Sequence, residues 1–349
     1  MRPAGVFDED YHGSIATVRT RFQWVVLLAG LAALFLFPLS PWASSYWLGL
    51  LNFIAITAIV VLGLQIVTGY CGQVSLGQAA IMGVGAYTSA VLTTKLGLSF
   101  WLALPLSGLT AGVVGVLVGA PSLRVKGFYL ALATLAAHFI IIWLMSHLNF
   151  TGETRGLVMA APQIGGFSLR GDFRMFYLIM AVLVLMTFFA KNLARTRIGR
   201  AFVAIRDNDI AAEVMGINVW RYKMLAFFIA CVYAGIGGSL WAGWVQSVNF
   251  EQFPLWNEIW YVAMIIIGGV SSISGVFFGV IFLKLLDELV LFAAPVLGEA
   301  FPFLGGAQYA LGLSAFGLVL ILFLLFEPRG LAHRWELLKA SVRLYPFPY

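Results

Sequence analysis

Residues 46–67 read YWLGLLNFIAITAIVVLGLQIV, a run without one charged side chain. A helix needs about 20 mainly apolar residues to cross the hydrocarbon core of a bilayer. This stretch is long enough and therefore predicts one membrane-spanning helix. The charge-free region around it is longer still, because no Asp, Glu, Lys or Arg occurs between Arg21 and Lys95. That region has room for three crossings.

The composition of the whole chain supports the same prediction. Of its 349 residues 61% are hydrophobic and 10% are charged, and the mean hydropathy is +0.95. Soluble domains carry about 25% charged residues, and a water-facing globule cannot hide so large an apolar excess. A soluble enzyme is thus excluded. The net charge of +6 is interpreted as a sign of membrane orientation rather than of a nucleic-acid partner.

Apolar segments bounded by charges, Pro or Gly continue to the carboxyl end. The predicted spans are 24–39, 46–67, 69–94, 101–120, 128–148, 175–190, 224–248, 259–283, 285–300 and 303–326. The sequence predicts an all-α, polytopic integral membrane protein with about ten transmembrane helices. Its transmembrane domain covers 24–326.

Basic residues predict the orientation of these spans. The densest cluster of Lys and Arg lies in 191–223, and cytoplasmic loops of membrane proteins are rich in both. An even number of spans then makes 1–23 and 327–349 cytoplasmic and the loop 149–174 external. The first span has the length of a secretory signal core, but acidic Asp8, Glu9 and Asp10 precede it, so we expect it to be retained. The expected location is the inner membrane of the cell.

Motifs for catalysis and for nucleotide binding are missing from the sequence. No Lys follows a Gly, so the chain cannot contain a Walker A phosphate loop. There is no His-Glu-x-x-His, no Gly-x-Ser-x-Gly and no metal cluster among the four histidines, and we expect no enzyme activity, no metal and no cofactor in this chain. Ion-coupled carriers hold ionisable groups in their spans; here His138 is the clearest one, and we interpret it as a hydrogen-bonded packing residue. A pore, a passive carrier or a subunit driven by another chain remains.

Glycine is concentrated in the predicted spans in two kinds of pattern. Gly108, Gly112, Gly115 and Gly119, and again Gly275 and Gly279, have the small-residue spacing of closely packed helices. Residues 69–80, GYCGQVSLGQAA, differ because they add polar side chains at membrane depth. A broken or re-entrant helix beside the translocation path would suit them, with interhelical packing as the alternative. The candidate path residues are Gly72, Gln73, Ser75, Gly77 and Gln78. Residues 268–275, GGVSSISG, have a similar texture and hint at an internal repeat.

The basic loop contains a helix-compatible stretch, RAFVAIRDNDIAAEVMG at 200–216. Asp207 or Asp209 is expected to cap a short helix that begins at Ile210 and that Gly216 ends. The stretch could lie on the membrane surface or dock into a cytoplasmic partner. The candidate docking residues are Arg200, Arg206, Asp207, Asp209, Ile210, Ala211, Ala212, Glu213 and Gly216.

At this loop the sequence resembles a known family. Residues 197–223, together with GQVSLGQAA at 72–80, GFYLALATLA at 127–136 and FEPRGL at 326–331, are similar to the branched-chain amino acid ABC transporter permeases, in particular to the longer of their two membrane subunits. Two motifs depart from the family. The outer motif Thr-Gly-Gly-x-x-Gly-Leu reads TGETRGL at 151–157, with Glu153 in place of the second glycine. The coupling pattern Glu-Ala-Ala-x-x-x-Gly has Ile210 in place of its glutamate.

The resemblance implies an ABC importer permease fold and a set of partners. These are a second homologous permease, two ATP-binding subunits that use ATP and Mg, an extracytoplasmic solute-binding protein and membrane lipid, with no nucleic acid. Thr151, Gly152, Glu153 and Arg155 are expected to face the solute-binding protein. The implied substrate is a branched-chain or related aliphatic amino acid. The alternatives are a sister importer for urea, short amides or aromatic acids, and an ion-coupled carrier or passive channel.

Overall fold

The computed structural model describes residues 21–40, 43–122, 127–164, 167–300, 308–327 and 329–344. Residues 1–20 of the predicted amino-terminal segment 1–23 therefore lie outside the described residues. The same holds for the end of the predicted tail, 345–349, and for the expected start of the last span at Phe303.

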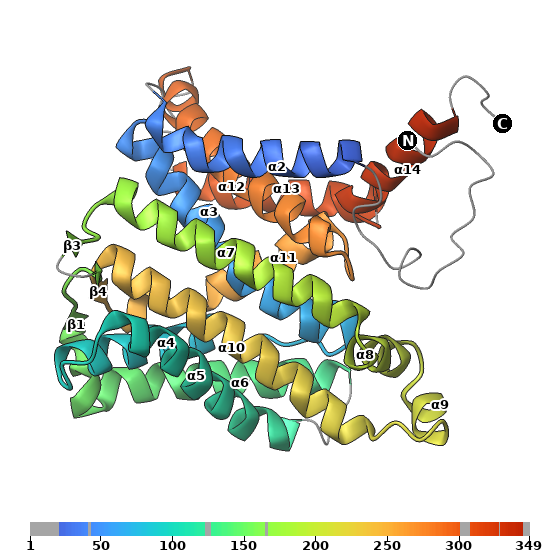
Figure 1. The fold of residues 1–349 in the computed structure, drawn as a ribbon, viewed down its shortest axis with the longest axis horizontal. Coiled ribbons are helices and arrows are strands. Elements are labelled where there is room, and N and C mark those ends of the chain that lie inside the picture. Colours follow the sequence, from blue (N-terminus) through green and yellow to red (C-terminus); the bar gives the residue numbers. More distant parts are fainter. Residues whose placement is uncertain are drawn as a thin grey trace.

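Helices make up nearly all of the described chain and run side by side in one bundle (Figure 1). They are α2 (Arg21–Leu36), α3 (Ser45–Leu64), α4 (Gln78–Thr94), α5 (Phe100–Ser122), α6 (Phe128–His147), α7 (Asp172–Arg195), α8 (Arg197–Asp207), α9 (Asp209–Val214), α10 (Val219–Val245), α11 (Leu255–Gly268), α12 (Ile273–Ala300), α13 (Gln308–Phe326) and α14 (Leu331–Leu344). A π-helical turn, η2 (Gln65–Tyr70), extends α3, and short 3-10 turns lie at Phe37–Leu39, Asn149–Thr151, Glu153–Arg155 and Phe250–Gln252.

Four two-residue strands lie in the connections. β1 (Leu157–Val158) pairs antiparallel with β4 (Ser247–Val248), and this pair joins the loop that follows α6 to the loop that follows α10. β2 (Gln163–Ile164) pairs antiparallel with β3 (Phe167–Ser168), and both lie within the loop between α6 and α7.

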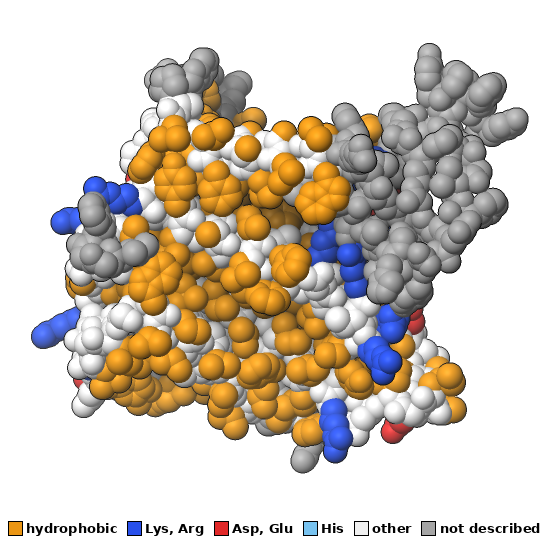
Figure 2. Space-filling view, viewed as in Figure 1, with side chains coloured by type: hydrophobic (Ala, Val, Ile, Leu, Met, Phe, Trp, Pro, Cys, Tyr) orange, Lys and Arg blue, Asp and Glu red, His pale blue; other side chains and the backbone are white. Residues whose placement is uncertain are grey.

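Several helices have the length and hydropathy of membrane spans. Among the described residues five qualify singly, namely 45–70, 100–120, 128–147, 172–195 and 219–245, and up to seven qualify if each of two bent helix pairs counts as one. Hydrophobic side chains cover a wide face of the bundle, and the Lys and Arg side chains visible on that face lie toward its ends (Figure 2). The predicted class, an all-α polytopic membrane protein, is confirmed. The total of ten crossings also depends on shorter helices such as α4.

Helix α10 lies at the centre and packs against α3, α4 and α5. The four glycines of α5 all face it. A Cβ added at Gly115 would lie 2.1 Å from Sγ of Cys231, and one added at Gly112 would lie 2.7 Å from the ring of Phe228. The predicted close packing at this small-residue row is thereby confirmed.

The predicted spans 259–283 and 285–300 are wrong in their boundaries. Helix α11 ends at Gly268, the chain bends by 120°, and α12 runs without a break through residue 284. Gly269 (φ 116°) and Ser271 (φ 69°) form the turn. A Cβ at Gly279 would lie 1.9 Å from the carbonyl oxygen of Met264, so glycine lets the two backbones touch. Hydropathy does not detect such a turn because the residues on both sides of it are equally apolar.

The elements at the two ends of the bundle differ in kind. Helices α8, α9 and α14 lie at the end where α2 begins, and the strands β1 and β4 lie at the opposite end (Figure 1). Below, these are called the α8 end and the strand end.

Candidate coupling segment, helix break and cavity

Helix α8 is anchored in the α8 end of the bundle. Thr196 caps it, since its Oγ1 accepts a hydrogen bond from the backbone N–H of Gly199 at 3.4 Å. Phe202 and Ile205 are buried, and the helix contacts α7, α10 and η2. Its apolar face therefore packs on protein rather than on the surface of a membrane.

Helix α9 has well-defined ends, one of which differs from expectation. The predicted caps Asp207 and Asp209 are wrong, because Oδ1 of Asn208 accepts from the backbone N–H groups of Ile210 (3.1 Å) and Ala211 (3.0 Å). All three residues have side chains that can cap, and spacing alone does not rank them. The predicted stop is confirmed: Gly216 has a φ of 84°.

The carboxyl end of α9 is a Schellman turn. The backbone N–H of Gly216 donates to the carbonyl of Glu213 at 2.9 Å, and that of Ile217 donates to the carbonyl of Ala212 at 3.0 Å. This pattern needs a left-handed residue, which glycine supplies without steric cost.

The tip of α9 is exposed and apolar. Ile210 is 68% exposed, and Val214 and Met215 are each 82% exposed. An ion pair of 3.5 Å between Asp209 and Lys223 joins the base of α9 to α10, and Ala212 faces inward. The remaining candidate docking residues are also exposed: Arg200, Arg206, Asp207, Ala211, Glu213 and Gly216.

Arg206 connects α8 to two breaks in the helices of the bundle. Its Nη1 donates to the carbonyl of Gly69 at 3.2 Å and to Oγ of Ser271. Ser271 in turn donates to the carbonyl of Gly69 at 2.6 Å, and Nε2 of Gln65 donates to the carbonyl of Gly269 at 3.2 Å. The two glycine-rich stretches noted in the sequence are therefore in direct contact, and α8 holds both.

The first of these breaks separates α3 from α4. After the π-helical turn the chain is non-helical from Cys71 to Gly77, so the predicted broken helix is confirmed. Gly72 has a φ of 71°, and a Cβ there would lie 2.7 Å from Cγ of Arg206. Only glycine fits both its backbone conformation and its contact with α8.

The other candidate path residues are buried in protein. Nε2 of Gln78 donates to the carbonyls of Ala230 (3.0 Å) and Val60 (3.3 Å), which is the interhelical bonding of the alternative interpretation. Ser75, Gly77 and Gln78 border a small hollow of about 20 Å³ beside His138, and Gln73 is also buried. A role in the translocation path remains a prediction for these residues.

The hollow lies next to a buried carboxylate that the sequence analysis missed. Glu258 is completely buried; its Oε1 accepts from the backbone N–H of Ala79 at 2.5 Å and lies 3.3 Å from Nδ1 of His138. Glu258 thus holds the first turn of α4, where backbone N–H groups have no helical partner. His138 is hydrogen-bonded, in line with its interpretation as a packing residue. The sequence feature that could have identified Glu258 is an acidic residue between Trp256 and Trp260, next to a long apolar run.

The loop expected to face a solute-binding protein lies at the strand end. Thr151 is buried and donates to the carbonyls of Met145 (2.7 Å) and Leu148 (2.6 Å). Gly152 and Glu153 both have positive φ, 81° and 55°, and the side chains of Glu153 and Arg155 are exposed. Glu153 therefore adopts a conformation that glycine would adopt more easily.

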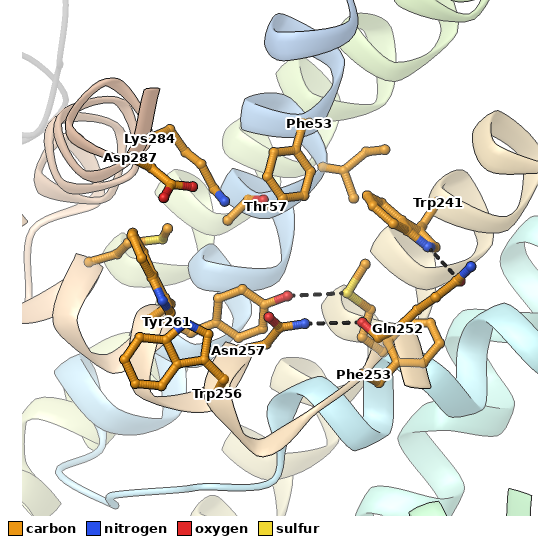
Figure 3. A pocket seen from close by; sticks show the side chains of 14 residues that line it. Phe53, Thr57, Trp241, Gln252, Phe253, Trp256, Asn257, Tyr261, Lys284 and Asp287 are labelled. Atoms are coloured by element: carbon orange, nitrogen blue, oxygen red, sulfur yellow. Dashed lines mark hydrogen bonds between the residues drawn. The ribbon is translucent and has the colours of Figure 1, made fainter. Parts of the chain in front are cut away.

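A cavity of about 180 Å³ lies between α3, α4, α10, α11 and α12 (Figure 3). Six of its fourteen lining residues are aromatic: Phe53, Trp241, Phe253, Trp256, Trp260 and Tyr261. Lys284 and Asp287 of α12 enter it from one side, and Gln252 and Trp241 lie on the opposite side, joined by a 3.1 Å hydrogen bond. Lys284 falls between the predicted spans 259–283 and 285–300, whereas in the structure it lies within the continuous helix α12, as does Asp287. In the part of the chain that the structure describes, no group of three or more His, Cys, Asp or Glu could hold a metal ion.

These features define a multi-pass membrane protein in which α8 is hydrogen-bonded to two helix breaks inside the bundle and the neighbouring α9 is exposed at the same end. A family model described as "Branched-chain amino acid transport system / permease component" matches residues 46–326. The chain belongs to this family, whose members are permease components and not enzymes.

Individual relatives differ in what their names say they carry. The chain is 33% identical over 254 residues to the high-affinity branched-chain amino acid transport system permease protein LivM of Escherichia coli, a match covering 66% of this chain and 60% of the relative. It is 23% identical over 244 residues to a probable LivM of Methanocaldococcus jannaschii, covering 66% and 67%. It is 26% identical over 287 residues to the galactofuranose transporter permease YtfT of Escherichia coli, covering 75% and 79%. No solved structure matches the chain.

Proposed function

We propose that this chain is a permease subunit of an ABC importer that moves branched-chain or related aliphatic amino acids across the cell membrane. It works with a second permease, two ATP-binding subunits that hydrolyse ATP with Mg, and an extracytoplasmic solute-binding protein. The α8 end faces the cytoplasm, and the loop around Glu153 faces the solute-binding protein.

The hydrogen bonds from Arg206 of α8 to the two helix breaks are the observation that best supports a permease driven by ATP-binding subunits. An exposed apolar tip on α9 suits the helix-in-groove mode of partner binding. Because α8 is hydrogen-bonded to Gly69 and Ser271, a movement of α8 and α9 would pull on both helix breaks at once. A passive channel has no need for such a connection.

The substrate class is supported by the family and by the named relatives. The family description and the two LivM proteins name branched-chain amino acids. The galactofuranose permease covers more of this chain at lower identity, which makes a sugar the second candidate.

Uptake by the complete system tests the proposal. The chain is expressed with its own second permease, ATP-binding subunits and binding protein in cells that lack branched-chain amino acid uptake, and labelled leucine is supplied. We expect ATP-dependent accumulation that isoleucine and valine compete away and that galactose, urea and acetamide do not. Uptake of labelled galactose without uptake of leucine would transfer the proposal to sugars, and leucine uptake that survives inactivation of the ATP-binding subunits would refute it.

A further inference from the structure

The cavity of Figure 3 contains two ionisable side chains among apolar helices, one of which, α3, belongs to a segment with the length and hydropathy of a membrane span. Phe53 and Thr57, near the middle of α3, lie on one wall, and Lys284 and Asp287, one turn apart on α12, lie on another. Ionisable side chains within a span are costly, and they mark pathways and binding sites when they face a cavity. The structure thus combines a cation, a carboxylate and an empty space in one place.

The two charges do not neutralise each other by direct contact. No ion pair within the described residues includes Lys284 or Asp287. Nζ of Lys284 instead lies 3.7 Å from the ring centroid of Phe53 and 5.4 Å from that of Trp260. Cation–π contacts of this kind hold the ammonium group while leaving its hydrogen-bond donors available to an anion.

The rest of the wall suits an apolar body. Trp256 and Tyr261 of α11 face Trp241 of α10 across the cavity, and Trp260 of α11 also lines it. An engineered cavity of about 150 Å³ in another protein takes up benzene, so about 180 Å³ has room for a compact aliphatic side chain. Ligand sites are typically such apolar spaces with a few convergent polar groups.

We propose that this cavity binds a zwitterionic aliphatic amino acid inside the membrane. Lys284 receives its carboxylate, Asp287 receives its ammonium group, and the aromatic rings receive its side chain. The inference rests on the proposed function and adds to it a site in the permease itself, separate from selection by the soluble binding protein.

The test measures binding of labelled leucine to the purified permease complex in nanodiscs without the solute-binding protein. Lys284→Met and Asp287→Asn should each weaken leucine binding by about 10- to 100-fold, the range expected for losing a hydrogen bond to a charged group. Glu288→Gln is the matched control, because Glu288 neighbours Asp287 on α12 and does not line the cavity; it should bind leucine as the unchanged complex does.

Two leucine analogues assign the roles of the charges. 4-Methylpentanoate lacks the ammonium group, so its weak binding should not change in Asp287→Asn and should fall in Lys284→Met. 3-Methylbutylamine lacks the carboxylate and should show the reverse. The same pattern must hold in variants whose melting temperature equals that of the unchanged complex, which separates lost ligand contacts from lost folding.

Failure of this inference differs from failure of the proposed function. If the complete system imports leucine and both variants import it with unchanged KM and kcat, the cavity is not a substrate site and the proposed function stands. If the complete system imports galactose and no aliphatic amino acid, the proposed function fails and this inference with it.

Discussion

The side chain of Glu258 makes hydrogen-bond contacts with two other helices of the bundle. Its carboxylate is the acceptor for the backbone of α4 and the partner of His138, and it is completely buried. Removing one partner of a buried polar cluster leaves the others without hydrogen bonds, which costs more than the bond itself contributes.

We therefore expect Glu258→Leu to destabilise the protein by about 3 kcal/mol and Glu258→Gln by about 1 kcal/mol. Glutamine keeps an oxygen acceptor for Ala79, whereas leucine leaves both Ala79 and His138 without a partner. Thermal melting of the purified protein measures the difference, with Glu288→Leu as the control on a side chain that is not fully buried. Melting temperatures of both Glu258 variants equal to that of the unchanged protein would show that the carboxylate is not what holds α4.

Glu153 has a positive φ of 55°, a backbone conformation that disfavours residues other than glycine. A left-handed conformation costs an ordinary residue about 1–2 kcal/mol, and glycine adopts it freely. Glu153→Gly should therefore raise stability by about 0.5–1 kcal/mol, after allowing for the greater entropy of glycine in the unfolded chain. The melting temperature should rise, and that of Arg155→Gly in the same turn, where φ is not positive, should not. A fall for Glu153→Gly would mean that the Glu153 side chain makes a contact worth more than the strain.

At the scale of elements, the sequence predicts helices far better than it predicts their breaks. Most spans follow from the need for about 20 apolar residues, and those of α2, α3, α5, α6, α7 and α10 agree with the helices to within about five residues. Helix α4 begins at Gln78, after the helix break, rather than at residue 69. The turn between α11 and α12 was not predicted, because a glycine that forms a turn and a glycine that packs two helices together look the same in the sequence. For the same reason Lys284, Asp287 and Glu258 could not be assigned to a cavity or a helix end from the sequence.

Helix α9 requires its glycine stop if it is to dock as we propose. Gly216→Trp puts a bulky residue at a φ of 84°, so the Schellman turn should open and transport should collapse while the chain still inserts. Gly216→Asn is the control, since asparagine tolerates left-handed angles, and it should retain most of the transport. Uptake is measured at matched membrane expression. Normal uptake by the tryptophan variant would rule out this turn as part of the docking element.

Arg206 gives a second prediction at this scale, about the joint between α8 and the two breaks. Arg206→Met removes the donors to Gly69 and Ser271 but keeps an unbranched apolar stem against Gly72. ATP hydrolysis by the complex should continue while transport per ATP falls at least about tenfold, equivalent to about 1.4 kcal/mol of lost coupling. Arg197→Met, at the exposed start of the same helix, should leave the ratio unchanged. A parallel fall of hydrolysis and transport would point to lost assembly instead.

At the scale of the whole molecule, the structure links the aromatic cavity, the turn between α11 and α12, and helix α8. The aromatic cavity shares α11 with Glu258, α11 leads into the turn at Gly269, and that turn meets α8 through Ser271 and Arg206. A ligand that moved α11 would therefore act on α8 through the contacts of Ser271 and Arg206. The hydrogen bonds of Arg206 and of Glu258 join residues that are far apart in sequence. Residue spacing and periodicity therefore identified 200–216 as a candidate docking stretch but did not show which residues it contacts.

The same arrangement predicts the orientation of the chain in the membrane. The basic cluster at 191–223 contains α8 and α9, which lie at the same end of the bundle as α14 (Figure 1). Lys and Arg are enriched on the cytoplasmic side of membrane proteins. Cysteines are introduced singly at Val214, 82% exposed on α9, and at Glu153, exposed at the strand end. The native Cys71 and Cys231 are buried and contribute little background. An impermeant maleimide on intact cells should label only Glu153→Cys.

Permeabilising the cells extends this test to the partner. Val214→Cys should then become labelled when the chain is expressed without ATP-binding subunits, and it should be protected when they are present, because docking would cover the apolar tip of α9. Labelling of Val214→Cys in intact cells would invert the topology. Equal labelling with and without the ATP-binding subunits, in a complex shown by co-purification to be assembled, would place their contact elsewhere on the α8 end.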